Sequence, residues 1–118
     1  MKLIDCHTHT QFSVDSEADL GMCAERADRL GLAAYAVTDH CECNSWYPAE
    51  HYSDGDDMHD SYRYKDCFLD SVAAVTALKE KYNGKFNLIC GVEMGQPQAA
   101  PEVAAFINAD DRVDFIIG

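Results

Sequence analysis

The chain has 118 residues, 47% of them hydrophobic, and a formal net charge of −12 at pH 7. This length suits one small domain with a buried core, and the negative charge argues against binding to nucleic acid or to an anionic membrane. The sequence shows neither a signal peptide nor a stretch long enough to span a membrane. We therefore expect a cytoplasmic protein whose six cysteines are reduced.

In the first half of the chain, apolar residues alternate between strand and helix spacing. KLIDC predicts a first strand, and residues 16–31 have helical spacing, with Ser16 as the expected cap and Gly31 as the expected end. LAAYAVT predicts a second, buried strand. Residues 41–64 are polar, acidic and aromatic, and we expect them to form a long loop without a regular element.

The second half of the chain continues this alternation. A helix is predicted from about Asp66 to Asn83, KFNLICGVE predicts a third strand, Pro101 suits the start of a third helix, and VDFIIG predicts a fourth strand. The order βαβαβαβ is typical of an α/β fold with a parallel sheet covered by helices. Four strands cannot close a barrel, which takes about eight. We therefore expect residues 1–118 to be part of a longer protein, or else to associate with another copy through the open strand edge.

Several side chains that bind metals follow the first predicted strand. His7 and His9, in DCHTHT, are two residues apart and so point to the same side of the strand end. Paired imidazoles at this spacing suit a divalent cation, although such a pair also occurs by chance. Asp15 lies on the loop that follows.

The next two predicted strands end in the same kind of residue. AVTDH places Asp39 and His40 where the second strand ends, and GVE places Glu93 at the end of the third. Parallel strands have their carboxyl ends at one edge of the sheet, which is where active sites form. The pattern therefore favours a metal site at this edge over a merely polar rim.

The motifs DCHTHTQFSVDS, TDH and GVE resemble those of the polymerase-and-histidinol-phosphatase (PHP) family, and within it the histidinol-phosphatase branch. The resemblance covers the whole chain but only the first half or so of a family domain. It implies that residues 1–118 are the N-terminal part of a single metal-dependent phosphoesterase domain. The implied fold is a distorted TIM-like (β/α)7 barrel. Two or three divalent ions (zinc, iron or manganese) are expected at its mouth.

The resemblance also assigns these side chains to particular ions. His7 and His9 are implied to bind one ion together with Glu93, which bridges to a second. Asp15 and His40 are implied to bind a third.

The TDH motif supplies the candidates for catalysis, Asp39 and His40, and we expect Asp39 to position its neighbours rather than to bind metal. The implied reaction is hydrolysis of a small phosphomonoester by metal-activated water, with L-histidinol phosphate of histidine biosynthesis as the expected substrate. One alternative is a phosphodiesterase or exonuclease of the same family. Another is a metal-binding fragment without activity. Neither a nucleic acid nor a membrane is expected as a partner.

Other reactive side chains lie in the long acidic loop. Cys41 and Cys43 are expected to be ordinary loop thiols, with metal binding as the alternative. His51 and His59 are expected to be solvated, with a role in a lid as the alternative. Asp54, Asp56, Asp57 and Asp60 are expected to form a solvated stretch. Arg63 and Lys65 are expected to lie on the surface, with binding of a substrate phosphate as the alternative.

Overall fold

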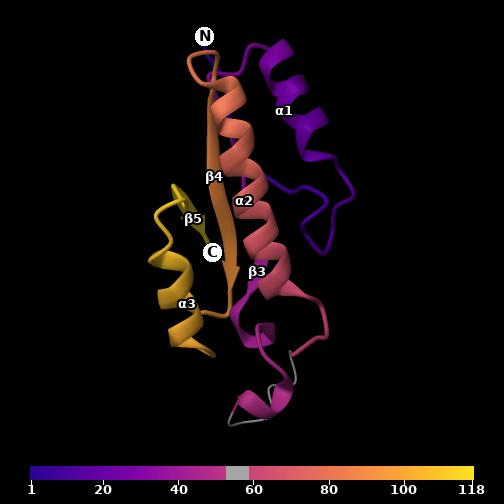
Figure 1. Cartoon of the computed structure of the whole chain (residues 1–118), viewed down its shortest axis with the longest axis vertical. Coiled ribbons are helices and arrows are strands. Elements are labelled where there is room, and N and C mark those ends of the chain that lie inside the picture. The colour runs from indigo at the N-terminus through magenta and orange to yellow at the C-terminus, as the bar shows by residue number, and fades with distance from the viewer. Residues whose placement is uncertain (53–58) are drawn as a thin grey trace.

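The computed structural model describes residues 1–52 and 59–118, so the predicted surface residues Asp54, Asp56 and Asp57 lie outside the described ranges. Within these ranges the chain forms five strands and three α-helices (Figure 1). The strands are β1 (Ile4–Thr8), β2 (Ala34–Val37), β3 (His40–Glu42), β4 (Asn87–Gly95) and β5 (Phe115–Ile117). The helices are α1 (Leu20–Arg29), α2 (Tyr64–Tyr82) and α3 (Pro101–Asn108), with two short 3-10 helices, η1 (Cys43–Ser45) and η2 (Ala49–His51).

All strand pairs in the sheet are parallel. β1 pairs with β2, the first half of β4 pairs with β2, and its second half pairs with both β3 and β5. With β2 and β3 taken as one interrupted strand, the strands lie side by side in chain order, the arrangement that begins a TIM-like barrel. The predicted α/β fold class is confirmed. In the described ranges β5 pairs with β4 alone, and self-association through this edge stays a prediction.

The second strand continues further than the sequence indicated. The amide of Thr38 donates to the carbonyl of Thr8 at 2.8 Å, and the amide of Glu93 donates to the carbonyl of Asp39 at 3.1 Å. The backbone hydrogen bonding therefore continues through the interruption, and His40 lies in β3, opposite Glu93. The pairing of β3 with β4 therefore fixes the position of His40, which does not lie on a loop.

The prediction that residues 41–64 contain no regular element was wrong. They include most of β3, both 3-10 helices and the first residue of α2. Cys41 and Cys43 have no exposed surface, and Trp46 is 6% exposed. These side chains anchor a largely polar segment to the core, so the two cysteines are core thiols rather than loop thiols.

Helix α1 begins later than predicted. Asp19 is its N-cap and accepts a hydrogen bond at 2.8 Å from a backbone amide of the first turn. Ser16, the predicted cap, instead donates to the carbonyl of His9 at 3.1 Å, and so holds the loop between β1 and α1. Gly31 ends the helical segment with a φ of +70°, a conformation that glycine adopts without strain.

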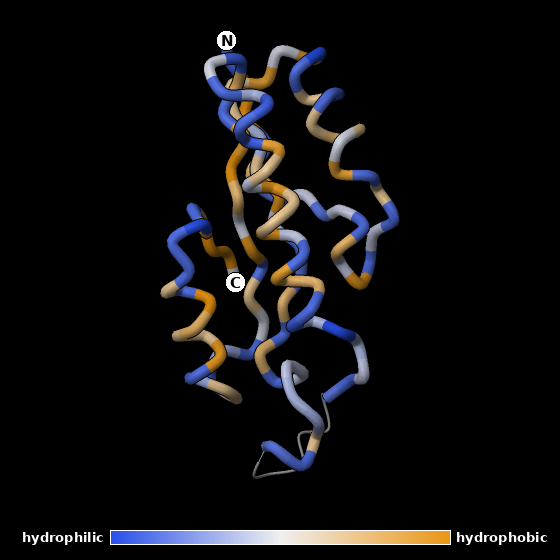
Figure 2. The backbone as a smooth tube through the Cα atoms, viewed as in Figure 1, coloured by the Kyte–Doolittle hydropathy of each residue, from blue (hydrophilic) through white to orange (hydrophobic). Residues whose placement is uncertain are grey.

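Helix α2 lies along β4 and covers the centre of the sheet (Figure 1). Its buried side chains include Phe68, Val72 and Val75, and burial of each contributes about 1.5–3 kcal/mol. They belong to one core cluster with residues of α1, α3, β2 and β4, and Figure 2 shows hydrophobic stretches along the central strands and in α3. In the described ranges, no helix combines the length and the apolar character that a membrane crossing requires.

Candidate metal centre

One group of potential metal ligands joins the end of β1 to β4. The Nε2 atoms of His7 and His9 each lie 2.8 Å from the same carboxylate oxygen, Oε2 of Glu93. The side chains of His9 and Glu93 are 17% and 25% exposed, whereas that of His7 is 58% exposed. The three residues offer one ligand atom each, all within 4.8 Å of one another, which is a spacing that a single ion can bridge.

A second group shares His9 with the first. Nδ1 of His9 lies 2.9 Å from Oδ2 of Asp15, and Nε2 of His40 lies 3.4 Å from the same oxygen. The ring centroids of His9 and His40 are 4.5 Å apart. These ligand atoms too lie within 4.8 Å of one another. The structure therefore brings together all five predicted metal ligands, with the imidazole of His9 at the centre.

Ser13 positions part of the second group, a role that the sequence did not indicate. Its hydroxyl donates to Oδ1 of Asp15 at 2.7 Å and accepts from the amide of His40 at 3.2 Å. Ser13 is 2% exposed, so it has little access to competing water. The only signal in the sequence was a serine two residues before an aspartate, a pattern common in turns.

The carboxylates of the two groups are easily ionised. Burial by itself would raise the pKa of Asp15, but the hydrogen bond from Ser13 and the neighbouring imidazoles outweigh it and lower the pKa to about 2. Burial also opposes ionisation of Glu93, and hydrogen bonds and charge interactions with the histidines again lower its pKa. Both side chains are therefore carboxylates at neutral pH, the form that binds cations.

Asp39 faces the protein interior, in contrast to its neighbour His40. It is 5% exposed. Oδ1 accepts from the amide of Thr10, while Oδ2 accepts from the hydroxyls of Thr10 at 2.9 Å and Ser71 at 2.6 Å. These bonds tie the segment after β1 to α2, which agrees with the expected positioning role. A catalytic role for Asp39 stays a prediction.

Glu42 lies beside the second group and was not among the predicted site residues. Its Oε1 is 3.6 Å from Nδ1 of His40. Burial raises the pKa of Glu42, His40 opposes this effect, and the carboxylates of Glu93 and Asp60 add to it. A signal was present in the sequence, because side chains two apart on a strand share a side. The segment, however, was predicted to be a loop.

Comparison with known proteins decides the family. Residues 5–118 match the PHP domain. The chain belongs to the PHP family. The three sequence motifs had predicted this, and the prediction is confirmed.

The PHP chain is also similar to a solved structure, histidinol phosphate phosphatase from Lactococcus lactis subsp. lactis in complex with zinc, L-histidinol and phosphate. The TM-score is 0.70 and the identity 24%, and the similarity covers 98% of this chain and 38% of that one. The PHP chain thus spans 38% of the length of that protein, and the likeness shows a shared fold. No match was found among curated proteins.

The loop histidines of the PHP chain lie outside both groups of ligands. Nε2 of His51 lies 3.1 Å from Oε1 of Glu102 and links η2 to α3. His59 lies 2.8 Å from a backbone carbonyl oxygen. Arg63, directly before α2, pairs with Asp66 in the first turn of that helix at 2.9 Å. In the structure these side chains therefore contact the surrounding scaffold.

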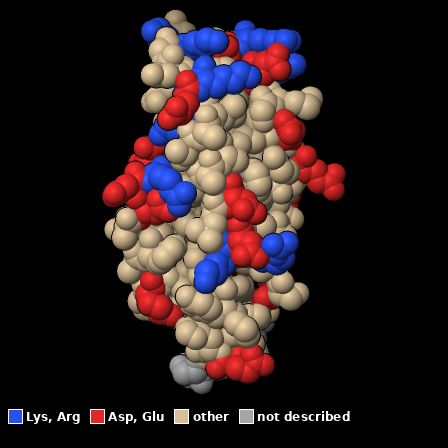
Figure 3. Space-filling view, in the orientation of Figure 1, with Lys and Arg blue, Asp and Glu red and all other residues tan. Residues whose placement is uncertain are grey.

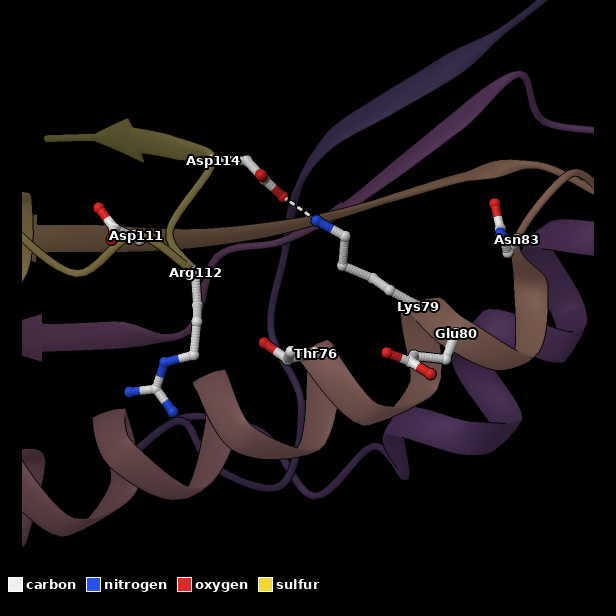
Figure 4. Close-up of a pocket in the computed structure, with 7 residues that line it drawn as sticks. All are labelled: Thr76, Lys79, Glu80, Asn83, Asp111, Arg112 and Asp114. Atoms are coloured by element: carbon white, nitrogen blue, oxygen red, sulfur yellow. Dashed lines mark hydrogen bonds and ion pairs between the residues drawn. The ribbon is translucent and has the colours of Figure 1, made fainter.

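A pocket between α2 and the segment before β5 includes none of the predicted site residues (Figure 4). Lys79 donates to Asp114 at 2.5 Å, and Arg112 pairs with Asp110 at 2.6 Å. Both cations are thus neutralised by carboxylates. The pocket is lined by Thr76, Lys79, Glu80, Asn83, Asp111, Arg112 and Asp114.

Proposed function

We propose that the PHP chain is the N-terminal part of a metal-dependent phosphatase domain that hydrolyses a small phosphomonoester, with L-histidinol phosphate as the specific candidate. The observation that carries the proposal is the pair of ligand groups that share His9 at the carboxyl ends of parallel strands. The similarity to a histidinol phosphate phosphatase solved with zinc, L-histidinol and phosphate supports this choice of substrate.

The ligand set suits a divalent transition metal. Imidazole nitrogens together with carboxylate oxygens match the preferences of zinc, iron and manganese better than those of calcium, which takes oxygen ligands. We assign His7, His9 and Glu93 to one ion, with Glu93 bridging to a second, and Asp15 and His40 to a further ion. When bound, such ions neutralise the phosphate oxygens and lower the pKa of a coordinated water.

The residues of the chain hold these ligands in place before any ion is present. Glu93 accepts hydrogen bonds from His7 and His9, and Ser13 fixes Asp15 relative to the backbone of His40. Preorganised ligands lose less conformational entropy when an ion binds. No nucleophilic side chain is needed, because the attacking group in this reaction class is water.

The charge distribution favours a small substrate over a nucleic acid. The net charge is −12. On the face shown in Figure 3, Lys and Arg gather mainly at the end of the molecule where the N-terminus lies, while Asp and Glu are spread over the surface. The candidate site lies instead toward the carboxyl ends of the strands. We propose that the enzyme acts in the cytoplasm on a free metabolite.

Metal analysis of the purified chain, combined with assays on histidinol phosphate and on a nucleotide diester, tests the proposal. We expect stoichiometric metal and release of phosphate from the monoester. Cleavage of the diester alone would instead support the phosphodiesterase alternative, and metal binding without turnover would support the non-catalytic one. Glu50→Gln, which alters an exposed carboxylate outside both groups, is the matched control for variants of Glu93.

A further inference from the structure

The imidazole of His40 lies between two sets of carboxylates. Its Nε2 atom faces Oδ2 of Asp15 at 3.4 Å and Oε2 of Glu93 at 3.7 Å. Its Nδ1 atom faces Oε1 of Glu42 at 3.6 Å. Because His40 and Glu42 are two residues apart in β3, their side chains leave the strand on the same side. Glu42 therefore faces one ring nitrogen of His40, while Asp15 and Glu93 face the other.

The neighbouring strand leaves room for this carboxylate. Glu42 lies opposite Gly95 in the pairing of β3 with β4, and a Cβ atom at position 95 would overlap the Glu42 carboxylate. Gly95 is not among the glycines with positive φ, which are Gly31 and Gly84. A glycine at position 95 is therefore needed to leave room for the Glu42 carboxylate, and not to allow an unusual backbone conformation.

An acceptor at one nitrogen of a histidine ring affects how the other nitrogen binds a metal. A neutral ring binds a metal through the lone pair of one nitrogen while the other nitrogen carries the proton. An acceptor at the protonated nitrogen selects the tautomer and fixes the orientation of the ring. We propose that Glu42 is a positioning residue that holds Nε2 of His40 toward Asp15 and Glu93, and that Gly95 makes room for it. This role rests on the proposed metal site at His40.

Two different substitutions disturb the same carboxylate. Glu42→Gln keeps the shape of the side chain but removes its charge. Gly95→Ala keeps Glu42 but displaces its carboxylate, which can swing aside because it is the end of a flexible side chain. The matched controls are Glu50→Gln on the surface and Gly21→Ala in α1, where an added Cβ would come within 3.2 Å of a side-chain oxygen of Asp19.

Titration of the whole chain with zinc, in competition with a chelating dye, measures the effect. The relevant binding step is the one that disappears in His40→Ala. We expect Glu42→Gln and Gly95→Ala each to weaken this step by about 10–100-fold. The double variant should lose little more than either single variant, because both act through one carboxylate. The visible spectrum of the cobalt-loaded chain should change in both variants and in neither control.

Circular dichroism of the metal-free variants checks that each has folded. Wild-type affinity in a folded Glu42→Gln variant would overturn the role of Glu42, and fully additive losses in the double variant would overturn the link to Gly95. In either case, metal binding by the unaltered chain would leave the proposed function standing. A chain that binds no zinc at all would instead overturn the proposed function and this role together.

Discussion

Nε2 of His9 lies 2.8 Å from Oε2 of Glu93, although 84 positions separate the two residues in the sequence. His9 directly follows β1 and Glu93 lies in β4, and these two strands are not neighbours in the sheet, because β2 lies between them. The contact therefore reaches across the end of β2 and joins the two sides of the candidate site. The other ring nitrogen of His9 faces Asp15, so one imidazole takes part in both ligand groups.

Replacing His9 should have a wider effect than replacing His7. His9 is assigned to one ion, near Glu93, and its Nδ1 atom also contacts Asp15, a ligand of another ion. His9→Ala should therefore weaken both of these zinc-binding steps, whereas His7→Ala should weaken one. Loss of a direct ligand should lower the zinc affinity by at least about 100-fold. That figure is the upper end of the loss caused by removing a residue that only supports a ligand. Zinc titration with circular dichroism measures both effects, and the helical content should be nearly unchanged.

His51→Ala is the control for these variants, since His51 pairs with Glu102 outside both groups. It should bind zinc like the unaltered chain. Normal metal content in His9→Ala would refute the assignment of the ligands.

Removing the Asp39 carboxylate should destabilise the fold. Asp39→Ala leaves the amide and hydroxyl of Thr10 and the hydroxyl of Ser71 without their buried acceptor, and should lower the free energy of unfolding by about 3 kcal/mol. Ser71→Ala removes one of these donors and should cost about 1–2 kcal/mol. Urea unfolding, followed by the fluorescence of Trp46, gives both values. Equal losses in the two variants would show that Asp39 does not act as the shared acceptor.

Asp114 should matter more for stability than its partner Lys79. Asp114 accepts from Lys79 and also from the backbone amide of Cys90 at 3.0 Å, so it ties the start of β5 to β4. Asp114→Ala should cost about 2 kcal/mol, because it leaves a backbone donor of the sheet unsatisfied. Lys79→Ala removes only a half-exposed ion pair and should cost less than about 1 kcal/mol. Thermal unfolding of both variants tests the difference, and a larger loss in Lys79→Ala would contradict it.

The buried thiols should resist alkylation while the chain is folded. Burial raises the pKa of Cys43 and of Cys90 to about 11 each, and it raises the pKa of Cys41 further. These thiols stay protonated at pH 8, and the thiolate that reacts with iodoacetamide would form only as the pH approaches 11. Mass spectrometry after labelling at pH 8 should find these three cysteines unmodified, unlike the half-buried ones.

Urea should make the three buried thiols react as well, which serves as the positive control. Rapid labelling of Cys41 or Cys43 in the folded chain would show that β3 and η1 open readily. It would then contradict their place in the core.

The sequence by itself determined the order of the strands and helices apart from β3 and the two 3-10 helices, and it determined which side chains are candidate metal ligands. Both are local properties. Strand and helix spacing can be read over a few residues, and His7 and His9 share a side because they are two apart on a strand. The position of His40 and Glu93 near one edge follows from a parallel sheet alone. The segment after His40 was missed because its polar composition concealed the buried Cys41 and Cys43.

Only the tertiary structure decided how the ligands combine. That His9 contacts Glu93, that Ser13 reaches the backbone of His40 and that Glu42 lies opposite Gly95 depend on strand register and on how loops return to the sheet. Such contacts join residues whose separation in the sequence gives no measure of their separation in space. A periodicity read along the chain cannot supply them, because they arise only when the sheet and its helices pack together.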